Sequence, residues 1–352
     1  MKKLTKYAIL ALIAAVLFWG AQRILMPKYM TGIYEGALIR EYYAEEKNHE
    51  VMIIGDCEVY ENISPITLWR NYGITSYIRG SAQQLIWQSY YLLEETLRYE
   101  KPKVVIFSVL SLKYNEPQSE SYNRLTLDGM KPSRTKYEAV RASVTGDESI
   151  ISYFFPVLRY HDRWRELDVS DFKYFWKTSP VSHNGFMMRM DVKPADVIPT
   201  GPKLNNYRFG NNSYAYLDKI TSLCKENDIE LLLIKAPSIY PYWYPEWEQQ
   251  MQDYAAENDL NYINTLDCLD EIGLDFGKHT YDGGLHLNCQ GAEFLADYLG
   301  KYLISNYGLT DYRENPGVSE IYNEKARKYD AMKDAQVREI AETGKVLTFI
   351  LK

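Results

Sequence analysis

The hydrophobic and polar positions along the chain predict an alternation of buried strands and amphipathic helices. Short continuous apolar runs, typical of strands buried on both faces, occupy residues 51–55 (VMIIG), 75–78, 103–110 (KVVIFSVL), 230–236 (ELLLIKA) and 261–266. Helical patterns between them occupy residues 64–71, 84–99, 213–227, 246–258 and 290–306. This alternation favours an α/β fold with a parallel sheet covered by helices on both faces. Such sheets bind ligands at the carboxyl ends of their strands.

The alternation stops for about 100 residues in the middle of the chain. Residues 115–210 contain helix-like pieces, scattered Pro and Gly, and many aromatic side chains, which indicates an insertion. The residues after 310 are charged and helix-like. We therefore expect an N-terminal segment at 1–27, an α/β domain at 28–310 that carries the insertion, and a C-terminal extension at 311–352. The pattern leaves open whether that extension is solvated or packed on the domain.

The N-terminal segment has the pattern of a membrane anchor. An apolar run extends from Tyr7 to Ala21, and it is preceded by Lys2, Lys3 and Lys6. Fifteen residues are short for a spanning helix, which needs about 20, but apolar character resumes after Arg23. No A-x-A cleavage site follows the run. We expect a single-pass anchor in the cell membrane, with the basic flank in the cytoplasm and the rest of the chain outside. A cleaved signal peptide and a buried globular helix are the alternatives.

Composition narrows the classes of function. The net charge is −7, from 40 basic and 47 acidic residues, so we expect no nucleic-acid partner. The 32 tyrosines suit sugar stacking, although tyrosine also fills half-buried positions in any fold. Four cysteines could form up to two disulfides outside the cell, and their spacing fits no zinc pattern. We expect no metal and no cofactor.

The first candidate for chemistry is the Gly55-Asp56-Cys57 motif, which directly follows the first predicted strand. A thiol near a helix N-terminus can have a lowered pKa, because the amide dipoles favour the thiolate. Asp56 and Glu58 oppose this effect by like charge. Taken alone, a cysteine at a strand end is more often inert than catalytic.

The second candidate is the loop that contains Asp282 and His286, just before the last predicted helix. An aspartate near a histidine can orient the imidazole, which can then act as general base to a nucleophile. A loop histidine can also hold such a hydrogen bond for purely structural reasons. Because both motifs lie at predicted carboxyl ends of strands, they can converge on one cleft.

These motifs resemble the SGNH/GDSL hydrolase superfamily, which has its nucleophile in a G-D-S motif after the first strand and a D-x-x-H motif near the C-terminus. The resemblance covers about residues 50–115 and 213–306, and it implies a three-layer flavodoxin-like sandwich. The stretch ISPITLWRNYGITSYIRGSAQQLIWQSYYLLEE, residues 63–95, is similar to membrane-anchored SGNH-like proteins of Gram-positive bacteria. Those proteins are related to D-alanyl transfer in lipoteichoic-acid synthesis and to alginate O-acetylation.

The resemblance implies a role for each matching residue. Cys57 would be the nucleophile in place of serine, with His286 as base. Asp282 would orient the base, although the spacing from Asp to His is one residue longer than in the family. The oxyanion hole would use the backbone amides of Cys57 and Gly80. Its side-chain donor has no clean match, and the candidates are Asn115 and Gln84.

Two aromatic segments are candidates for substrate binding. Arg159 and His161 belong to an RYHDRW segment that could grip an anionic or sugar substrate, or form a surface helix with internal ion pairs. Tyr240 and Trp243 belong to residues 239–247, which could form a sugar-stacking lip over the cleft or a packed aromatic loop.

The implied function is an extracytoplasmic esterase or O-acyltransferase that acts on a cell-envelope polysaccharide or teichoic-acid-like substrate. The alternative is a catalytically inactive SGNH-like protein that binds polymer or assists a membrane-bound acyltransferase. Redox use of Cys57 with another cysteine is a third interpretation.

Overall fold

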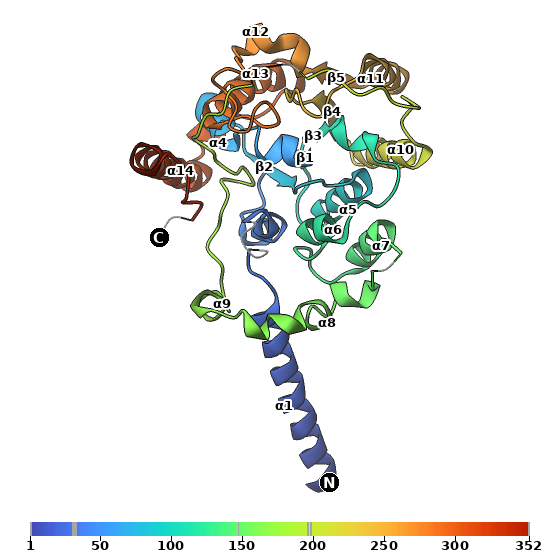
Figure 1. Ribbon diagram of the computed structural model, residues 1–352, viewed down its shortest axis with the longest axis vertical. Coiled ribbons are helices and arrows are strands. Elements are labelled where there is room, and N and C mark those ends of the chain that lie inside the picture. Colours follow the sequence, from blue (N-terminus) through green and yellow to red (C-terminus); the bar gives the residue numbers. More distant parts are fainter. Residues whose placement is uncertain (1, 30–33, 147, 196, 198, 351–352) are drawn as a thin grey trace.

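Five short strands form one parallel sheet at the centre of the computed structural model, which describes residues 2–29, 34–146, 148–195, 197 and 199–350 (Figure 1). The strands are β1 (Val51–Gly55), β2 (Ser76–Gly80), β3 (Val104–Ser108), β4 (Glu230–Lys235) and β5 (Asn261–Asn264). Their order is β2-β1-β3-β4-β5, with every pair parallel. This is the flavodoxin-like doubly wound order, so the predicted fold class is confirmed.

Helices cover both faces of the sheet and make a three-layer sandwich. One face packs against α3 (Cys57–Tyr60), α4 (Pro65–Tyr72) and α13 (Cys289–Tyr307). The other face packs against α5 (Ile86–Thr96), α10 (Asn211–Glu226) and α11 (Pro245–Asn258). In β1 the residues alternate between the layers, as a strand with period two requires: Val51 and Ile53 join the first core, and Met52 and Ile54 the second.

The insertion folds as short helices on one side and one end of the domain. It contains α6 (Glu120–Leu127), α7 (Arg134–Ser143), α8 (Val157–Tyr160) and α9 (Val169–Lys173), with 3₁₀ turns at Ile150–Tyr153 and His161–Arg165. Ala139 and Val140 of α7 pack on Leu92 of α5 in a small core of their own. After α9 an extended segment returns to the sheet, where Phe186 and Met187 join the first core.

The N-terminal helix α1 (Lys2–Leu25) projects from the domain as a stalk (Figure 1). Among the described residues it is the one helix long and apolar enough to cross a membrane, with a mean hydropathy of 2.0 over its most apolar window. Length and composition alone fit either an anchor or a signal sequence. Short helices at Tyr34–Ala37, Leu38–Glu41 (α2) and Tyr42–Ala44 then lead into β1.

The C-terminal extension is packed on the domain. After α12 (Leu269–Ile272), α13 and a 3₁₀ turn at Tyr312–Glu314, α14 (Pro316–Thr343) lies alongside α4. The ring of Tyr322 packs against that of Trp69 at an interplanar angle of 33°, with 4.7 Å between centroids, and both side chains are buried. Of the two possibilities left open by the sequence, the structure therefore shows the packed one.

Candidate active site

A cavity of about 450 Å³ brings the two predicted motifs together at the carboxyl ends of the strands. Cys57, from the end of β1, lines it together with Asp282 and His286, from the loop before α13. The loop after β2 contributes Ala82 and Gln83. Five tyrosines also line the cavity: Tyr60, Tyr114, Tyr122, Tyr240 and Tyr281.

Tight packing at the end of β1 places Cys57 at the first position of α3. Gly55 is required there, because a Cβ at this position would lie 2.9 Å from Cβ of Ser108. Asp56 is the N-cap of α3, and its side chain accepts a hydrogen bond from the backbone N–H of Glu58 at 3.1 Å. Cys57 follows and is partly exposed in the cavity.

The thiol of Cys57 is held in its protonated form at neutral pH. Burial raises its pKa to about 11, the neighbouring Asp56 adds to that rise, and His286 opposes it. Desolvation by the protein therefore outweighs the lowering that a helix N-terminus would cause.

Asp282 holds the ring and the backbone of His286 at the same time. Its Oδ2 lies 2.7 Å from Nδ1 of the ring, and its Oδ1 accepts the backbone N–H of His286 at 2.9 Å. Gly283 and Gly284, with φ of 88° and 102°, turn the chain tightly enough for this double contact. The longer spacing in this D-x-x-x-H motif thus still brings the carboxylate to the imidazole. The pKa of Asp282 is lowered despite burial, because the carboxylate accepts these hydrogen bonds.

The second ring nitrogen of His286, Nε2, is buried and is not occupied by a regular hydrogen bond to any described residue. The ring and the Cys57 thiol are close enough to shift each other's pKa. Burial lowers the pKa of His286, but the charge of Glu61 and the hydrogen bond to Asp282 raise it, and the pKa lies well above the usual value. The two carboxylates beside the ring therefore favour its charged form.

Glu61 is a second carboxylate at the imidazole that sequence reasoning missed. Its Oε2 lies 3.3 Å from Nδ1 of His286, and the hydroxyl of Tyr281 donates a hydrogen bond to the same oxygen. Burial raises the pKa of Glu61 to about 7, against the opposing charge of His286. The signal in the sequence was its position four residues after Cys57, which is one helical turn.

The glycine and glutamine predicted for the oxyanion hole do not line the cavity. Gly80 ends β2 opposite Gly55, and a Cβ there would lie 2.9 Å from Val59, so close packing explains the glycine. A role for its amide stays a prediction. Gln84 is buried, and its Nε2 donates to the carbonyl of Arg79 and to Ser89 at 3.2 and 3.0 Å. Because the side chain of Gln84 is used inside the loop, it does not fit the donor role.

Asn115 does not fit that role either. Its Oδ1 accepts the backbone N–H of Asn212 at 3.0 Å, in the first turn of α10. The side chain therefore caps a helix on the surface and is absent from the cavity lining. Of the loop residues that do line the cavity, Gln83 donates its Nε2 to the hydroxyl of Tyr114 at 3.2 Å.

The substrate-binding candidates separate into one that lines the cavity and three that do not. Tyr240 lines it and is 60% exposed. Trp243 is buried and donates its Nε1 to Glu248 at 2.8 Å, so this part of the loop is packed. Arg159 pairs with Glu120 at 2.9 Å, and His161 lies on the surface 3.6 Å from Asp162. The RYHDRW segment therefore lies on the surface beside α1, and its arginines pair with carboxylates outside the segment, Arg159 with Glu120 and Arg163 with Asp171.

A buried ion pair supports the floor of the site. Nζ of Lys235, at the end of β4, lies 2.6 Å from Oε1 of Glu58, and both side chains are fully buried. Ser108 donates to the other carboxylate oxygen at 3.0 Å, and Ser238 donates to Oε1. The residue next to Cys57 is thereby tied to β3 and β4.

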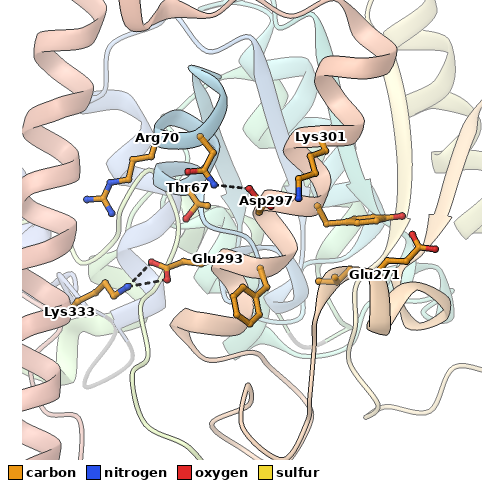
Figure 2. A pocket seen from close by; sticks show the side chains of 11 residues that line it. Thr67, Arg70, Glu271, Glu293, Asp297, Lys301 and Lys333 are labelled. Carbon is orange, nitrogen blue, oxygen red and sulfur yellow. Dashed lines mark hydrogen bonds and ion pairs between the residues drawn. The ribbon is translucent and has the colours of Figure 1, made fainter.

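A second cavity of about 460 Å³ lies between α4, α12, α13 and α14 (Figure 2). Four of its charged side chains form two ion pairs: Lys333 lies 2.8 Å from Glu293, and Lys301 lies 2.7 Å from Asp297. No cysteine or histidine is among the described residues that line it. The structure also has all four cysteines free, so Cys57 has no disulfide partner. The candidate chemistry is thus at the first cavity.

Comparisons with known proteins find solved structures that align with most of this chain at low sequence identity. No family profile matches the chain, and no curated protein is similar to it. A solved structure described as a lipolytic protein of the G-D-S-L family, from Desulfitobacterium hafniense DCB-2, aligns with 72% of this chain and 99% of its own, at 13% identity and a TM-score of 0.35. A structure described as an acylhydrolase, from Bacteroides fragilis NCTC 9343, aligns with 76% and 95% of the two chains at 11% identity and a TM-score of 0.37. A GDSL-like lipase from Bacteroides thetaiotaomicron VPI-5482 aligns with 77% and 98% at 11% identity and a TM-score of 0.37.

Proposed function

We propose that this protein is an extracytoplasmic SGNH-like esterase or O-acyltransferase acting on a cell-envelope carbohydrate. The observation that supports this proposal is the convergence of Cys57 and His286 in one cavity, with Asp282 holding the far side of the imidazole. A nucleophile, a base and an orienting carboxylate are the groups that acyl transfer needs.

The reaction would begin with the Cys57 thiol protonated and the His286 imidazole neutral. His286 takes the proton of the Cys57 thiol at Nε2, and the sulfur attacks the carbonyl carbon of an ester. The oxyanion is held by backbone N–H groups, among them that of Cys57, which as the first residue of α3 has no partner within the helix. Collapse of this intermediate releases the alcohol, which takes the proton from His286, and leaves a thioester on Cys57. Water or a sugar hydroxyl then attacks the thioester carbonyl while His286 takes its proton. The C–S bond breaks, the acid or the new ester is released, and the Cys57 sulfur regains its proton from His286.

A carbohydrate substrate is supported by the cavity walls and by the stalk. Five tyrosine rings line the cavity, and such rings stack on sugar faces while their hydroxyls bind polar groups. The helix α1, as a single-pass anchor, would hold the domain at the outer face of the membrane. The acceptor would then be a polysaccharide or a teichoic-acid-like polymer of the envelope.

One observation favours a second candidate, an accessory protein without catalysis. The pKa of the Cys57 thiol is raised to about 11, so the cysteine is not a resting thiolate. Such a protein would bind an envelope polymer in the same cavity and assist a membrane-bound acyltransferase.

Ester hydrolysis by the full-length chain in detergent separates the two candidates. The substrate is p-nitrophenyl acetate, and the variants are Cys57→Ala, His286→Ala and, as a matched control, Cys268→Ala, which removes another partly exposed cysteine. An esterase or acyltransferase predicts that the first two variants lose activity and the control keeps it. Equal rates in all four proteins would exclude hydrolysis at this site and leave the accessory function.

A further inference from the structure

The insertion exposes a group of large apolar side chains where α1 leaves the domain. In Figure 1, α8 and α9 lie on either side of the end of α1, and both helices and the intervening 3₁₀ turn contact it. The exposed apolar side chains of this region are Phe155, Leu158, Trp164, Val169, Phe172 and Trp176. We name these six residues the apolar collar.

The collar is attached to the last turns of α1. The rings of Phe155 and Phe18 lie 6.0 Å apart, and those of Trp176 and Trp19 lie 5.7 Å apart. Arg163 donates to the carbonyl of Leu25 at 2.6 Å, which satisfies a free group at the helix end. The collar and the stalk therefore keep a defined relative position.

The exposure of the collar is high for side chains of this kind. Trp164 is 62%, Trp176 76% and Val169 82% exposed. Clustered apolar exposure of this sort marks a surface that another apolar phase covers. The charges of residues 150–177 nearly cancel, with five basic and four acidic side chains, so this surface would bind by apolar burial.

A lipid bilayer fits this surface better than a protein does, because the collar continues the apolar surface of α1. The uninterrupted apolar run of α1, Tyr7 to Ala21, spans only ~22 Å at 1.5 Å per residue, which is short of a ~30 Å hydrocarbon core. The collar begins beside Phe18 and Trp19, in the last turns of that run. Tryptophan at this level is typical of the membrane–water interface.

We infer that the apolar collar inserts into the interface of the leaflet from which α1 emerges. This inference rests on the proposed role of α1 as an anchor. The cavity would then be held near the membrane surface, because Glu35, ten residues after the end of α1, lines it. Arg159 and His161 would lie at the headgroup level, which gives the RYHDRW segment a role apart from substrate binding.

Quenching of tryptophan fluorescence by brominated phosphatidylcholine tests the inference on the full-length chain in nanodiscs. Four of the seven tryptophans are buried, which leaves Trp19, Trp164 and Trp176 in reach of lipid. The double variant Trp164→Phe/Trp176→Phe is predicted to lose more than half of the lipid-dependent quenching. Trp243→Phe removes a buried indole, and its fluorescence is predicted to be quenched by brominated lipid to the same extent as that of the wild type.

Two further measurements keep the outcomes distinct. Aqueous iodide is predicted to quench Trp164 and Trp176 weakly in nanodiscs. Strong iodide quenching that disappears in Trp164→Phe/Trp176→Phe, together with lipid quenching that this double variant leaves unchanged, would overturn the inference, because the collar would then face water. If the chain does not remain with the nanodisc, α1 is not an anchor and the inference about the collar is overturned as well. Cys57→Ala is predicted to show wild-type lipid quenching, so failure of the catalytic proposal leaves this result unchanged.

Discussion

At the scale of single residues, the candidate site depends on how protons are shared around one imidazole. Asp282 contacts Nδ1 of His286 at 2.7 Å and also its backbone, whereas Glu61 approaches the same nitrogen at 3.3 Å. The carboxylate of Asp282, which makes the shorter contact and a second one to the backbone, sets the ring orientation. The longer contact mainly adds charge, which contributes to the raised pKa of His286.

This difference predicts unequal effects of two isosteric substitutions. Asp282→Asn removes the acceptor that fixes the tautomer and should lower kcat for ester cleavage by on the order of 100-fold to 10,000-fold. Glu61→Gln keeps the hydrogen bond from Tyr281 and should lower kcat by about 10-fold or less. Initial rates with p-nitrophenyl acetate measure both effects. A larger loss for Glu61→Gln would show that the orienting carboxylate is misassigned.

The protonation states predict activity that rises toward alkaline pH. The thiol pKa is raised to about 11 and the imidazole pKa is also raised, so both groups lose their protons at a higher pH than a free thiol and a free imidazole would. Since the imidazole must be neutral to act as base, kcat/KM should increase as the pH rises above neutrality. Glu61→Gln removes a charge that raises the pKa of His286, so its profile should move to lower pH. A wild-type maximum at or below pH 6 would contradict this account.

The ion pair under the site predicts a large stability difference between two lysine substitutions. Lys235→Met leaves the fully buried Glu58 without its cation and should lower the free energy of unfolding by about 3–5 kcal/mol. Lys101→Met removes a cation from an exposed pair with Asp228 and should change it by less than about 1 kcal/mol. Urea unfolding monitored by far-UV circular dichroism measures both. Similar urea midpoints for the two variants would show that the buried ion pair does not contribute this much to the free energy of unfolding.

The residues that sequence reasoning placed correctly are those whose position follows from the ends of elements. Cys57, Asp282 and His286 adjoin a strand or a helix, so their convergence could be predicted. The sequence left open whether Trp243 lies in a substrate-binding lip or in a packed loop, and whether Asn115 or Gln84 is the side-chain donor, because these positions depend on a partner that a residue pattern does not reveal. The indole of Trp243 donates to Glu248, and the amide of Asn115 caps α10.

At the scale of elements, the boundaries of helices and strands could be predicted where a capping residue or a proline marks them. Ser64 and Pro65 predicted the start of α4, and the Ser64 side chain accepts from the backbone N–H of Thr67 at 3.3 Å. The end of β5 was predicted two residues too far, because Thr265 and Leu266 belong to a 3₁₀ turn. The path of the insertion could not be predicted, since α8 and α9 are placed by contacts with α1, which lies well over 100 residues earlier.

The packed position of α14 predicts a large effect of one substitution on that helix. Tyr322→Ala removes a fully buried ring that packs against Trp69 and should destabilise the domain by roughly 3 kcal/mol or more. Val337→Ala, at a half-exposed position of the same helix, should change stability by no more than about 0.5 kcal/mol. Thermal unfolding of both variants measures the difference. Equal melting temperatures would indicate that α14 is a solvated appendage after all.

At the scale of the whole molecule, segments from the two ends of the α/β domain meet around one cavity. Cys57 follows β1, and His286 lies in the loop before α13. Because the doubly wound order brings the carboxyl ends of the strands to one edge, the meeting of these two residues follows from the topology. Glu35, from the segment between α1 and β1, also lines the cavity. With α1 as an anchor and the collar in the interface, the cavity would be fixed at the membrane surface, where envelope polymers emerge.

Peptide mass spectrometry of the acylated protein tests the central claim most directly. The full-length wild type, mixed with p-nitrophenyl acetate and quenched in acid, is predicted to carry one acetyl group as a thioester on Cys57. His286→Ala should carry much less, and Cys224, Cys268 and Cys289 should stay unmodified in both proteins. Equal labelling of Cys57 in the wild type and in His286→Ala, or none in either, would contradict the pairing of this thiol with this imidazole.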